Sequence, residues 1–308
     1  MRSEKEVFCR LVRRGHNMKS WGIIDKRGNQ YSTEERLHLI GCLAKWSANL
    51  YIFGQLKWKQ SIKPIQKAET EIFKRISKQC RNLGIELWAW MKPGDHRYVR
   101  HKSDRQQFID NAQRHMDLGA SGFYLLMDDM HRKVPNNPKG HIRQKDAEYH
   151  ARLIHELQKA LGNGFKAICG EHYHGVIPGI YTYYWEPIFE VLSKQVLLTW
   201  TGPRIWNRTL SPKDIPDMGW PLLLFDNYFA SDHDEPNRAP IYPYDGRSPE
   251  LTKHLEVAVI NPNNHYAWQF CAIQTAMTFW RAPDIYCPED AFKEAIRDLG
   301  DSYMENIL

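Results

Sequence analysis

Strand-length apolar runs alternate with helix-like segments along most of this chain, and this alternation limits the possible folds more than any other feature. Each run is bounded by glycine, proline or polar residues, as buried strands usually are. We expect strands at residues 7–12, 49–53, 85–91, 122–127, 165–169, 196–199, 221–225 and 257–260. Alternating strands and helices give parallel strands with crossover helices. Eight such units favour a closed (β/α)8 barrel of the TIM type over an open doubly wound sheet.

Helix signals fill the intervals between these strands. Ser32 and Glu35 form an S-x-x-E capping box, which predicts the start of a helix. Further helices are expected from Pro64, around 108–116, and at 147–161, 185–192, 266–280 and 289–299. We expect one barrel domain over residues 5–287, followed by a helix within 288–308 that packs on it. No G-x-G-x-x-G follows the first expected strand, which argues against a dinucleotide-binding fold.

The fourth expected strand ends in two adjacent carboxylates, Asp128 and Asp129. Barrels of this kind gather their active-site residues at the carboxyl ends of the strands, so the pair stands where catalytic groups are expected. Because side chains alternate along a strand, the two carboxylates should point in different directions, and one could transfer protons while the other does something else. The pair is also compatible with a helix N-cap or with a metal site.

Other polar residues follow the expected strands. The set is rich in carboxylates, carboxamides and aromatic rings, and it comprises Gly15, Lys57, Asp95, Asp128, Asp129, Tyr173, Trp200, Asn227, Asp232 and Asn263. Such groups bind sugar hydroxyls and stack on pyranose faces, and a carboxylate pair serves glycosidic bond cleavage. Adjacent acids suit the substrate-assisted variant, in which the 2-acetamido oxygen of the substrate is the nucleophile.

Seven short motifs follow one another along the chain between residues 45 and 263. They are 45–53, 123–130, 169–175, Trp200-Thr201-Gly202-Pro203, Asp226-Asn227 with Ala230 and Asp232, Tyr244-Asp245-Gly246-Arg247 with Glu250-Leu251, and Asn261-Pro262-Asn263. In this order they make the chain resemble the catalytic domain of glycoside hydrolase family 84, the O-GlcNAcase and hyaluronidase-type β-N-acetylglucosaminidases. The resemblance covers residues 7–281 and implies the barrel fold of that family.

The resemblance also implies roles at matching positions. Asp128 would orient and polarise the 2-acetamido group, and Asp129 would be the general acid/base. Tyr173 and Asn227 would hold the acetamido group and its cyclised intermediate.

The outer sugar hydroxyls would be bound by Asp232 and Asn263. Gly15 aligns with the glycine of the family's E-G-F-Y-G loop, the rest of which is not kept. The family's A-P-K-D-D segment is replaced here, so that Leu56 takes the place of the sugar-binding lysine and Lys57 stands one position later. A shifted loop would let Lys57 take over that contact.

The implied activity is that of a retaining exo-β-N-acetylglucosaminidase that acts through an oxazoline intermediate on a glycan or a glycosylated protein. No cofactor is expected, because the substrate supplies the nucleophile. Two alternatives follow from the altered loops. The barrel could act on another acetamido sugar or on an acidic glycan, or it could be an inactive sugar-binding homologue.

Composition excludes other classes of function. The net charge of +6 and the pI of 8.9 are compatible with an acidic polymer, but the basic residues are too dispersed for us to expect nucleic acid as a partner. No apolar run suits a signal peptide or a membrane span, so we expect a cytoplasmic protein. The six cysteines show no C-x-x-C spacing and should be free thiols. His172 and His174 lack a third ligand at a suitable spacing, so we expect no metal.

Overall fold

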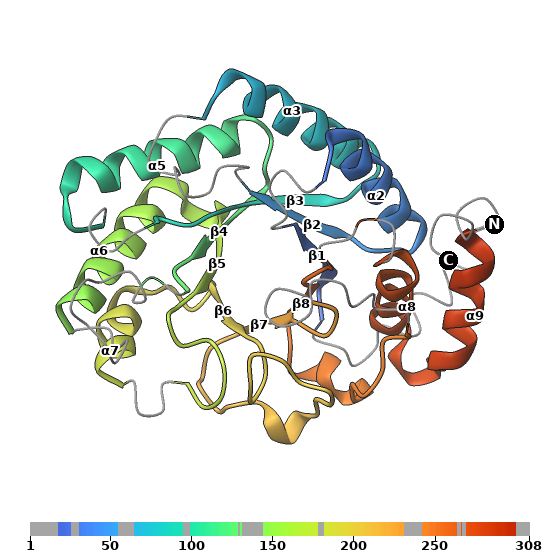
Figure 1. The fold of residues 1–308 in the computed structure, drawn as a ribbon. Coiled ribbons are helices and arrows are strands. Elements are labelled where there is room, and N and C mark those ends of the chain that lie inside the picture. Colours follow the sequence, from blue (N-terminus) through green and yellow to red (C-terminus); the bar gives the residue numbers. More distant parts are fainter. Residues whose placement is uncertain are drawn as a thin grey trace, which may run out of the picture.

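Eight parallel strands form a closed barrel in a computed structural model of the chain (Figure 1). The structure describes residues 18–25, 31–54, 65–94, 99–128, 130, 144–177, 182–230, 242–263, 266 and 269–299. The strands are β1 (Ser20–Asp25), β2 (Leu50–Gly54), β3 (Glu86–Met91), β4 (Gly122–Leu126), β5 (Phe165–Cys169), β6 (Leu197–Trp200), β7 (Leu222–Asp226) and β8 (Val257–Ile260). Each strand pairs with the next, and Ser20 of β1 pairs with Val257 of β8. The expected (β/α)8 barrel is therefore confirmed.

The first strand of the barrel is not the one expected from the sequence. Residues 7–12 lie outside the described part of the chain, and the strand that pairs with β2 and β8 is Ser20–Asp25. The sequence indicated a loop there, because residues 7–12 are followed by a polar segment that continues to the capping box at Ser32. The observed strand contains Gly22. In the barrel this glycine is required, since a Cβ would overlap the carbonyl oxygen of Leu50 on β2. Gly15 precedes β1, so the expectation that it follows the first strand is wrong.

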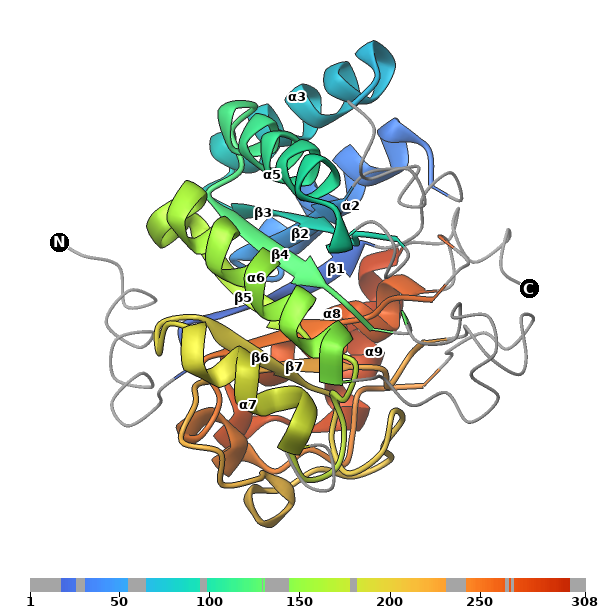
Figure 2. The same ribbon diagram turned by 90° about the vertical axis from the view of Figure 1, so that its left-hand side faces the viewer.

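Helices surround the barrel, as Figures 1 and 2 show. They are α2 (Thr33–Lys45), α3 (Lys67–Asn82), α5 (Lys102–Asp117), α6 (Gln144–Leu161), α7 (Thr182–Val191), α8 (Phe270–Arg281) and α9 (Pro288–Leu299). The capping box is confirmed, because Ser32 Oγ accepts from the Glu35 amide and Glu35 Oε2 accepts from the Ser32 amide. Short 3₁₀ turns, Pro212–Asp214 and Pro249–Lys253, lie between β6 and β7 and between β7 and β8. The last helix, α9, lies outside the barrel against α8 (Figure 1).

Two hydrophobic cores fill the molecule. The outer core lies between the strands and the surrounding helices. The inner core fills the barrel itself and consists of alternate strand residues, namely Ile24, Leu50, Ile52, Trp88, Trp90, Tyr124, Leu126, Ala167, Cys169, Leu197, Leu223, Phe225, Val257 and Val259. The interior is thus packed with side chains, as is usual for barrels of this size. The polar residues of the candidate site lie beyond this packed interior, at the carboxyl ends of the strands.

Two further observations concern the described residues. None of their helices combines the length and the apolar character that a membrane crossing requires. The cysteines that the structure describes, Cys42, Cys80, Cys169, Cys271 and Cys287, are free thiols, as expected.

Candidate active site

Inward-facing positions continue past the strand ends and form the mouth of the barrel. Side chains alternate along a strand, so the residue two positions after an inner-core residue faces the same way. The next such positions after the inner core are Lys92 (β3), Asp128 (β4), Glu171 (β5), Asn227 (β7) and Asn261 (β8). Direct contacts join two pairs of these residues, Lys92 with Asp128 and Asn261 with Asn227.

The first pair is an ion pair between adjacent strands. The Nζ of Lys92 lies 3.2 Å from Oδ2 of Asp128, and the two side chains are only 10% and 12% exposed. Burying a charge is costly unless an opposite charge compensates for it, and each of these residues provides that compensation for the other. Asp128, the expected acetamido-binding carboxylate, therefore lies buried at the mouth beside a fixed positive charge.

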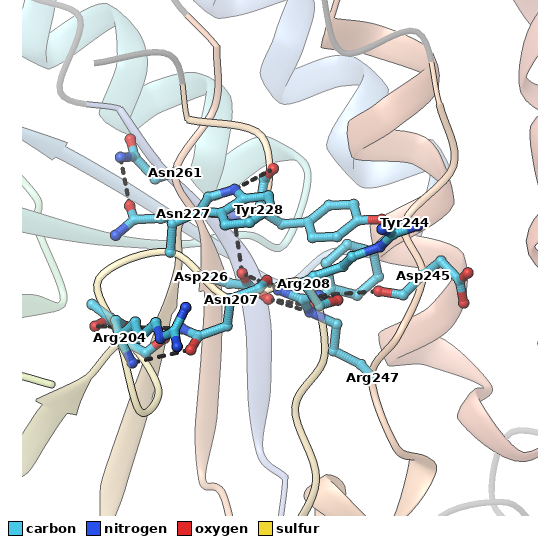
Figure 3. A network of polar contacts seen from close by, with 12 residues as sticks. Arg204, Asn207, Arg208, Asp226, Asn227, Tyr228, Tyr244, Asp245, Arg247 and Asn261 are labelled. Atoms are coloured by element: carbon cyan, nitrogen blue, oxygen red, sulfur yellow. Dashed lines mark hydrogen bonds and ion pairs between the residues drawn. The ribbon is translucent and has the colours of Figure 1, made fainter. Parts of the chain in front are cut away.

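The second pair consists of two side-chain amides. Asn261 donates from Nδ2 to Oδ1 of Asn227 over 2.9 Å, and Asn227 donates from its own Nδ2 to the carbonyl oxygen of Ile205 over 2.8 Å. Figure 3 shows Asn227 and Asn261 side by side. Because one bond fixes the oxygen and the other fixes the nitrogen, the Asn227 amide has a single orientation. A fixed carboxamide at a barrel mouth can select the donors and acceptors of a bound ligand.

A buried ion pair lies directly behind Asn227. Asp226 accepts from Nε of Arg247 at 2.9 Å through Oδ2 and from the terminal guanidinium nitrogen of Arg247 at 2.7 Å through Oδ1 (Figure 3). The hydroxyl of Tyr244 donates to Oδ2 of Asp226 at 2.6 Å, and the amide of Tyr228 donates to Oδ1 at 3.0 Å. Such bidentate pairing is strong and directional. The Asp226-Asn227 and Tyr244-Asp245-Gly246-Arg247 motifs therefore meet in one network, which holds the end of β7 in place.

The buried positive charge of Arg247 is stabilised by several further contacts. It donates to the carbonyl oxygens of Asn207 and Arg208, and its guanidinium lies 4.2 Å from the ring centre of Tyr228. Burial alone would lower the pKa of Arg247, but the carboxylate of Asp226 outweighs that effect and raises it above its ordinary value. Arg247 is accordingly a permanent cation of the framework.

A similar buried pair terminates β1. Arg36 of α2 donates from Nε to Oδ2 of Asp25 at 2.7 Å, and the hydroxyl of Tyr51 donates to the same oxygen at 2.8 Å. Arg36 also donates to the carbonyl oxygen of Tyr31, whose hydroxyl donates to the carbonyl oxygen of Asn263 at 2.5 Å. This chain of contacts links the end of β1 to the segment after β8.

The segment after β5 carries Glu171 and Tyr173. Glu171 is buried, and its amide donates to the hydroxyl of Tyr184 on α7 over 3.1 Å. Burial raises the pKa of Tyr184 far above its usual value, and the carboxylates of Glu171 and Asp128 raise it further. Tyr173 packs against the inner core, and its carbonyl oxygen accepts from the Thr201 amide at 2.9 Å. The carboxyl ends of β5 and β6 are thereby connected.

The structure covers only part of the expected site. Asp128, Tyr173, Trp200, Asn227 and Asn263 are described, and all five lie at or just beyond the carboxyl ends of strands. Trp200, however, is fully buried in the outer core between the strands and the helices, so the expectation that its ring belongs to the sugar-binding site is wrong. The other expected site residues lie outside the described residues, and these are Gly15, Lys57, Asp95, Asp129 and Asp232. Their proposed roles stay predictions.

Three residues of the mouth were not singled out from the sequence. Lys92 was missed, and Glu171 and Asn261 entered only as parts of motifs. Each lies two positions after the last inner-core residue of its strand, and its side chain therefore points to the same side. Counting alternate positions along β3, β5 and β8 could have found all three.

Metal binding finds no support in the described part of the chain, where no three His, Cys, Asp or Glu side chains cluster in a way that could hold an ion. His174 lies against the ring of Tyr173, and burial lowers its pKa. Among the described residues, the polar groups at the mouth are carboxylates, amides and one ammonium, which are suited to hydrogen bonding with a neutral, hydroxyl-rich ligand.

Comparison with known proteins agrees with this chemistry. A sequence model described as β-N-acetylglucosaminidase matches residues 27–308. The proteins named Protein O-GlcNAcase from Rattus norvegicus and Mus musculus are each 24% identical over 275 residues. These matches cover 83% of this chain but only 29% of the relatives' length, so the chain spans less than a third of the curated relatives it matches.

A solved structure of a mutant O-GlcNAc hydrolase from Thermobaculum terrenum superposes with a TM-score of 0.79. It shares 20% identity and covers 92% of this chain and 63% of its own. At that identity the likeness shows the shared fold.

A closed (β/α)8 barrel with a buried carboxylate and ordered amides at its mouth is the architecture of a sugar-cleaving barrel enzyme. Because the family model spans most of its length, the chain belongs to the β-N-acetylglucosaminidase family, glycoside hydrolase family 84.

Proposed function

We propose that the protein is a retaining exo-β-N-acetylglucosaminidase that cleaves terminal β-linked N-acetylglucosamine with the help of the substrate's own acetamido group. The observation that carries this proposal is the position of Asp128, a buried carboxylate facing inward at the mouth of a family 84 barrel. In the first step the acetamido oxygen attacks the anomeric carbon while the bond to the leaving oxygen breaks, which gives an oxazoline. In the second step water attacks the same carbon and reopens the ring, so the product keeps the β configuration.

Asp128 is assigned to the acetamido nitrogen. Its carboxylate would accept the N–H of that group and stabilise the positive charge that develops as the ring closes. Burial supports this role, because an electrostatic interaction is stronger where water is excluded.

Asp129 is assigned to proton transfer. It would protonate the leaving oxygen in the first step and take a proton from the attacking water in the second. Asp129 lies outside the described residues, so this assignment rests on its place directly after Asp128 and on family membership.

Asn227 and Tyr173 are assigned to the acetamido group and its cyclised form. The fixed orientation of the Asn227 amide supports this role, because a donor held in place beforehand needs no reorganisation when charge develops. Asn263 and Asp232 would bind the outer hydroxyls, and Gly15 and Lys57 remain further candidates for sugar binding. No cofactor is needed in this scheme.

The natural substrate is proposed to be a glycan or a glycosylated protein. The relatives named Protein O-GlcNAcase support the protein alternative. A cytoplasmic location remains part of the same proposal.

Hydrolysis of an aryl 2-acetamido-2-deoxy-β-glucoside, measured beside the plain aryl β-glucoside, tests the proposal. We expect turnover of the acetamido substrate alone, with the β anomer as the first product in a proton NMR time course. Asp128→Asn and Asp129→Asn should each lower kcat/KM by roughly 10² or more. Lys78→Met, on the exposed face of α3, is the matched control and should leave the rate unchanged.

Two results would contradict this function. Equal turnover of both substrates would exclude participation of the acetamido group. Absence of turnover, combined with tight binding of a thiazoline analogue of the cyclised intermediate, would instead identify a sugar-binding homologue without activity.

A further inference from the structure

The mouth of the barrel contains a buried lysine that the proposed reaction does not use. Lys92 extends from the end of β3, directly after an aromatic strand, and its side chain is 10% exposed. A lysine of this kind usually reaches solvent with its ammonium group. Here the ammonium lies 3.2 Å from Asp128 on the neighbouring strand.

We propose that Lys92 is a positioning residue for Asp128, which holds its carboxylate charged and in one orientation before a sugar binds. This inference rests on the proposed function, in which Asp128 receives the acetamido N–H.

The surroundings of Asp128 explain why such a residue is needed. Glu171 occupies the corresponding inward position on β5, so two acidic side chains share the mouth. Tyr124 on the same strand lies close enough for charge interaction with Asp128, and Tyr184 on α7 lies close enough for charge interaction with both carboxylates. A buried carboxylate with little water around it tends to take up a proton.

Lys92 supplies the positive charge in this set. A protonated Asp128 could not accept the acetamido N–H as an anion, so the ion pair keeps it competent for its proposed task. An opposite charge at this distance favours the ionised form of a carboxyl group. An ammonium on a flexible stem can also move when the ligand arrives, whereas a guanidinium held by two bonds would compete more strongly with the substrate.

The pairing is tested first without any substrate. We would measure thermal unfolding at pH 7 for wild type, Lys92→Met, Asp128→Asn and the double variant. Lys92→Met leaves Asp128 buried without its compensating charge, so its unfolding midpoint should fall. The double variant should be more stable than the sum of the two single changes predicts. Strictly additive changes would overturn the pairing.

The effect on the reaction is tested by pH profiles of kcat/KM on the aryl acetamido substrate. In Lys92→Met we expect the acidic limb to move upward by about one pH unit or more, and the rate near neutral pH to fall about tenfold. In Lys92→Arg the acidic limb of the profile should stay near the pH at which it lies in wild type. Lys78→Met, at an exposed position on α3, is the control. An unmoved limb in Lys92→Met would overturn the positioning role.

Failure of the proposed function would look different. If wild type turns over no acetamido substrate, binding of the thiazoline analogue replaces the rate measurement. The positioning role then predicts about tenfold weaker binding in Lys92→Met. Equal binding by Lys92→Met and wild type would reject it.

Discussion

Asn261 donates a hydrogen bond from its Nδ2 to Oδ1 of Asn227 over 2.9 Å, so the ends of β8 and β7 are joined by their side chains at the mouth of the barrel. Asn227 in turn donates to Ile205 in the segment after β6. Three successive strand ends are thus connected through one carboxamide, and that carboxamide is the one assigned to the acetamido group.

Asn261→Ala should weaken substrate binding more than it weakens the fold. Without the Asn261 donor, Oδ1 of Asn227 loses its partner and the amide can rotate. We expect kcat/KM for the aryl acetamido substrate to fall about tenfold, which corresponds to one hydrogen bond of ordinary net strength. Steady-state kinetics of Asn261→Ala and of exposed Asn82→Ala would measure the effect. Equal rates in both variants would show that Asn227 needs no such support.

Arg247→Met should strongly destabilise the protein. It leaves Asp226 buried with no guanidinium, which costs about 3–5 kcal/mol of the free energy of unfolding. Chemical denaturation would measure this loss. Arg75, whose partner Glu34 is 75% exposed, provides the matched control, and Arg75→Met should cost less than about 1 kcal/mol. A loss of similar size in both variants would contradict the distinction between buried and exposed pairs.

The stability of the protein should fall at mildly acidic pH because of His115. This side chain is buried on α5 against Phe73, and burial lowers its pKa below the ordinary value of 6.5. Below pH 6.5 the unfolded chain therefore binds a proton that the native protein does not bind. The free energy of unfolding should drop by up to about 1.4 kcal/mol per pH unit from this group.

Denaturant titrations between pH 5 and 8 would check the slope. His115→Gln should be less stable at neutral pH but should lose this part of the pH dependence. His155→Gln, at an exposed position on α6, is the control and should retain the wild-type slope. An unchanged slope in His115→Gln would assign the effect to other groups.

Two glycine substitutions should change the free energy of unfolding in opposite directions. Gly22→Ala would place a Cβ against the backbone carbonyl of Leu50, which cannot move without breaking the β1–β2 pairing. We expect a loss of at least about 2 kcal/mol of unfolding free energy. Gly41 lies within α2, and apart from its chain neighbours and the backbone of the helix itself, no atom of the described residues lies within 4 Å of the place for its Cβ. Gly41→Ala should therefore stabilise the protein by about 0.5–1 kcal/mol. Thermal unfolding of both variants would test the pair.

Most of the barrel could be predicted from the sequence, because seven strands are apolar runs of normal length with clear boundaries. The first strand could not, since Ser20–Asp25 falls within the segment after residues 7–12 that indicates a polar loop, and it contains Gly22. Only the position of β2 explains that glycine, and β2 is distant along the chain.

The residues at the mouth of the barrel could be predicted only in part, for a related reason. Asp128, Asn227 and Asn263 belong to short motifs that can be read in order along the chain. Lys92 belongs to none, and its significance depends on the carboxylate that the adjacent strand places beside it. A pairwise contact of this kind is determined by the register between strands, which single-sequence patterns do not contain.

The pairing of β1 with β8 has a consequence for how the protein is made. Lys19 and Glu256, which flank this seam, form an ion pair across 237 positions of sequence. The barrel cannot close until β8 has left the ribosome, and until then β1 presents an unpaired edge. Closure must also overcome the entropy of a very long loop, so it should be a slow, late step of folding. We therefore expect the β1–β8 seam to be the part of the molecule most dependent on chaperones during synthesis.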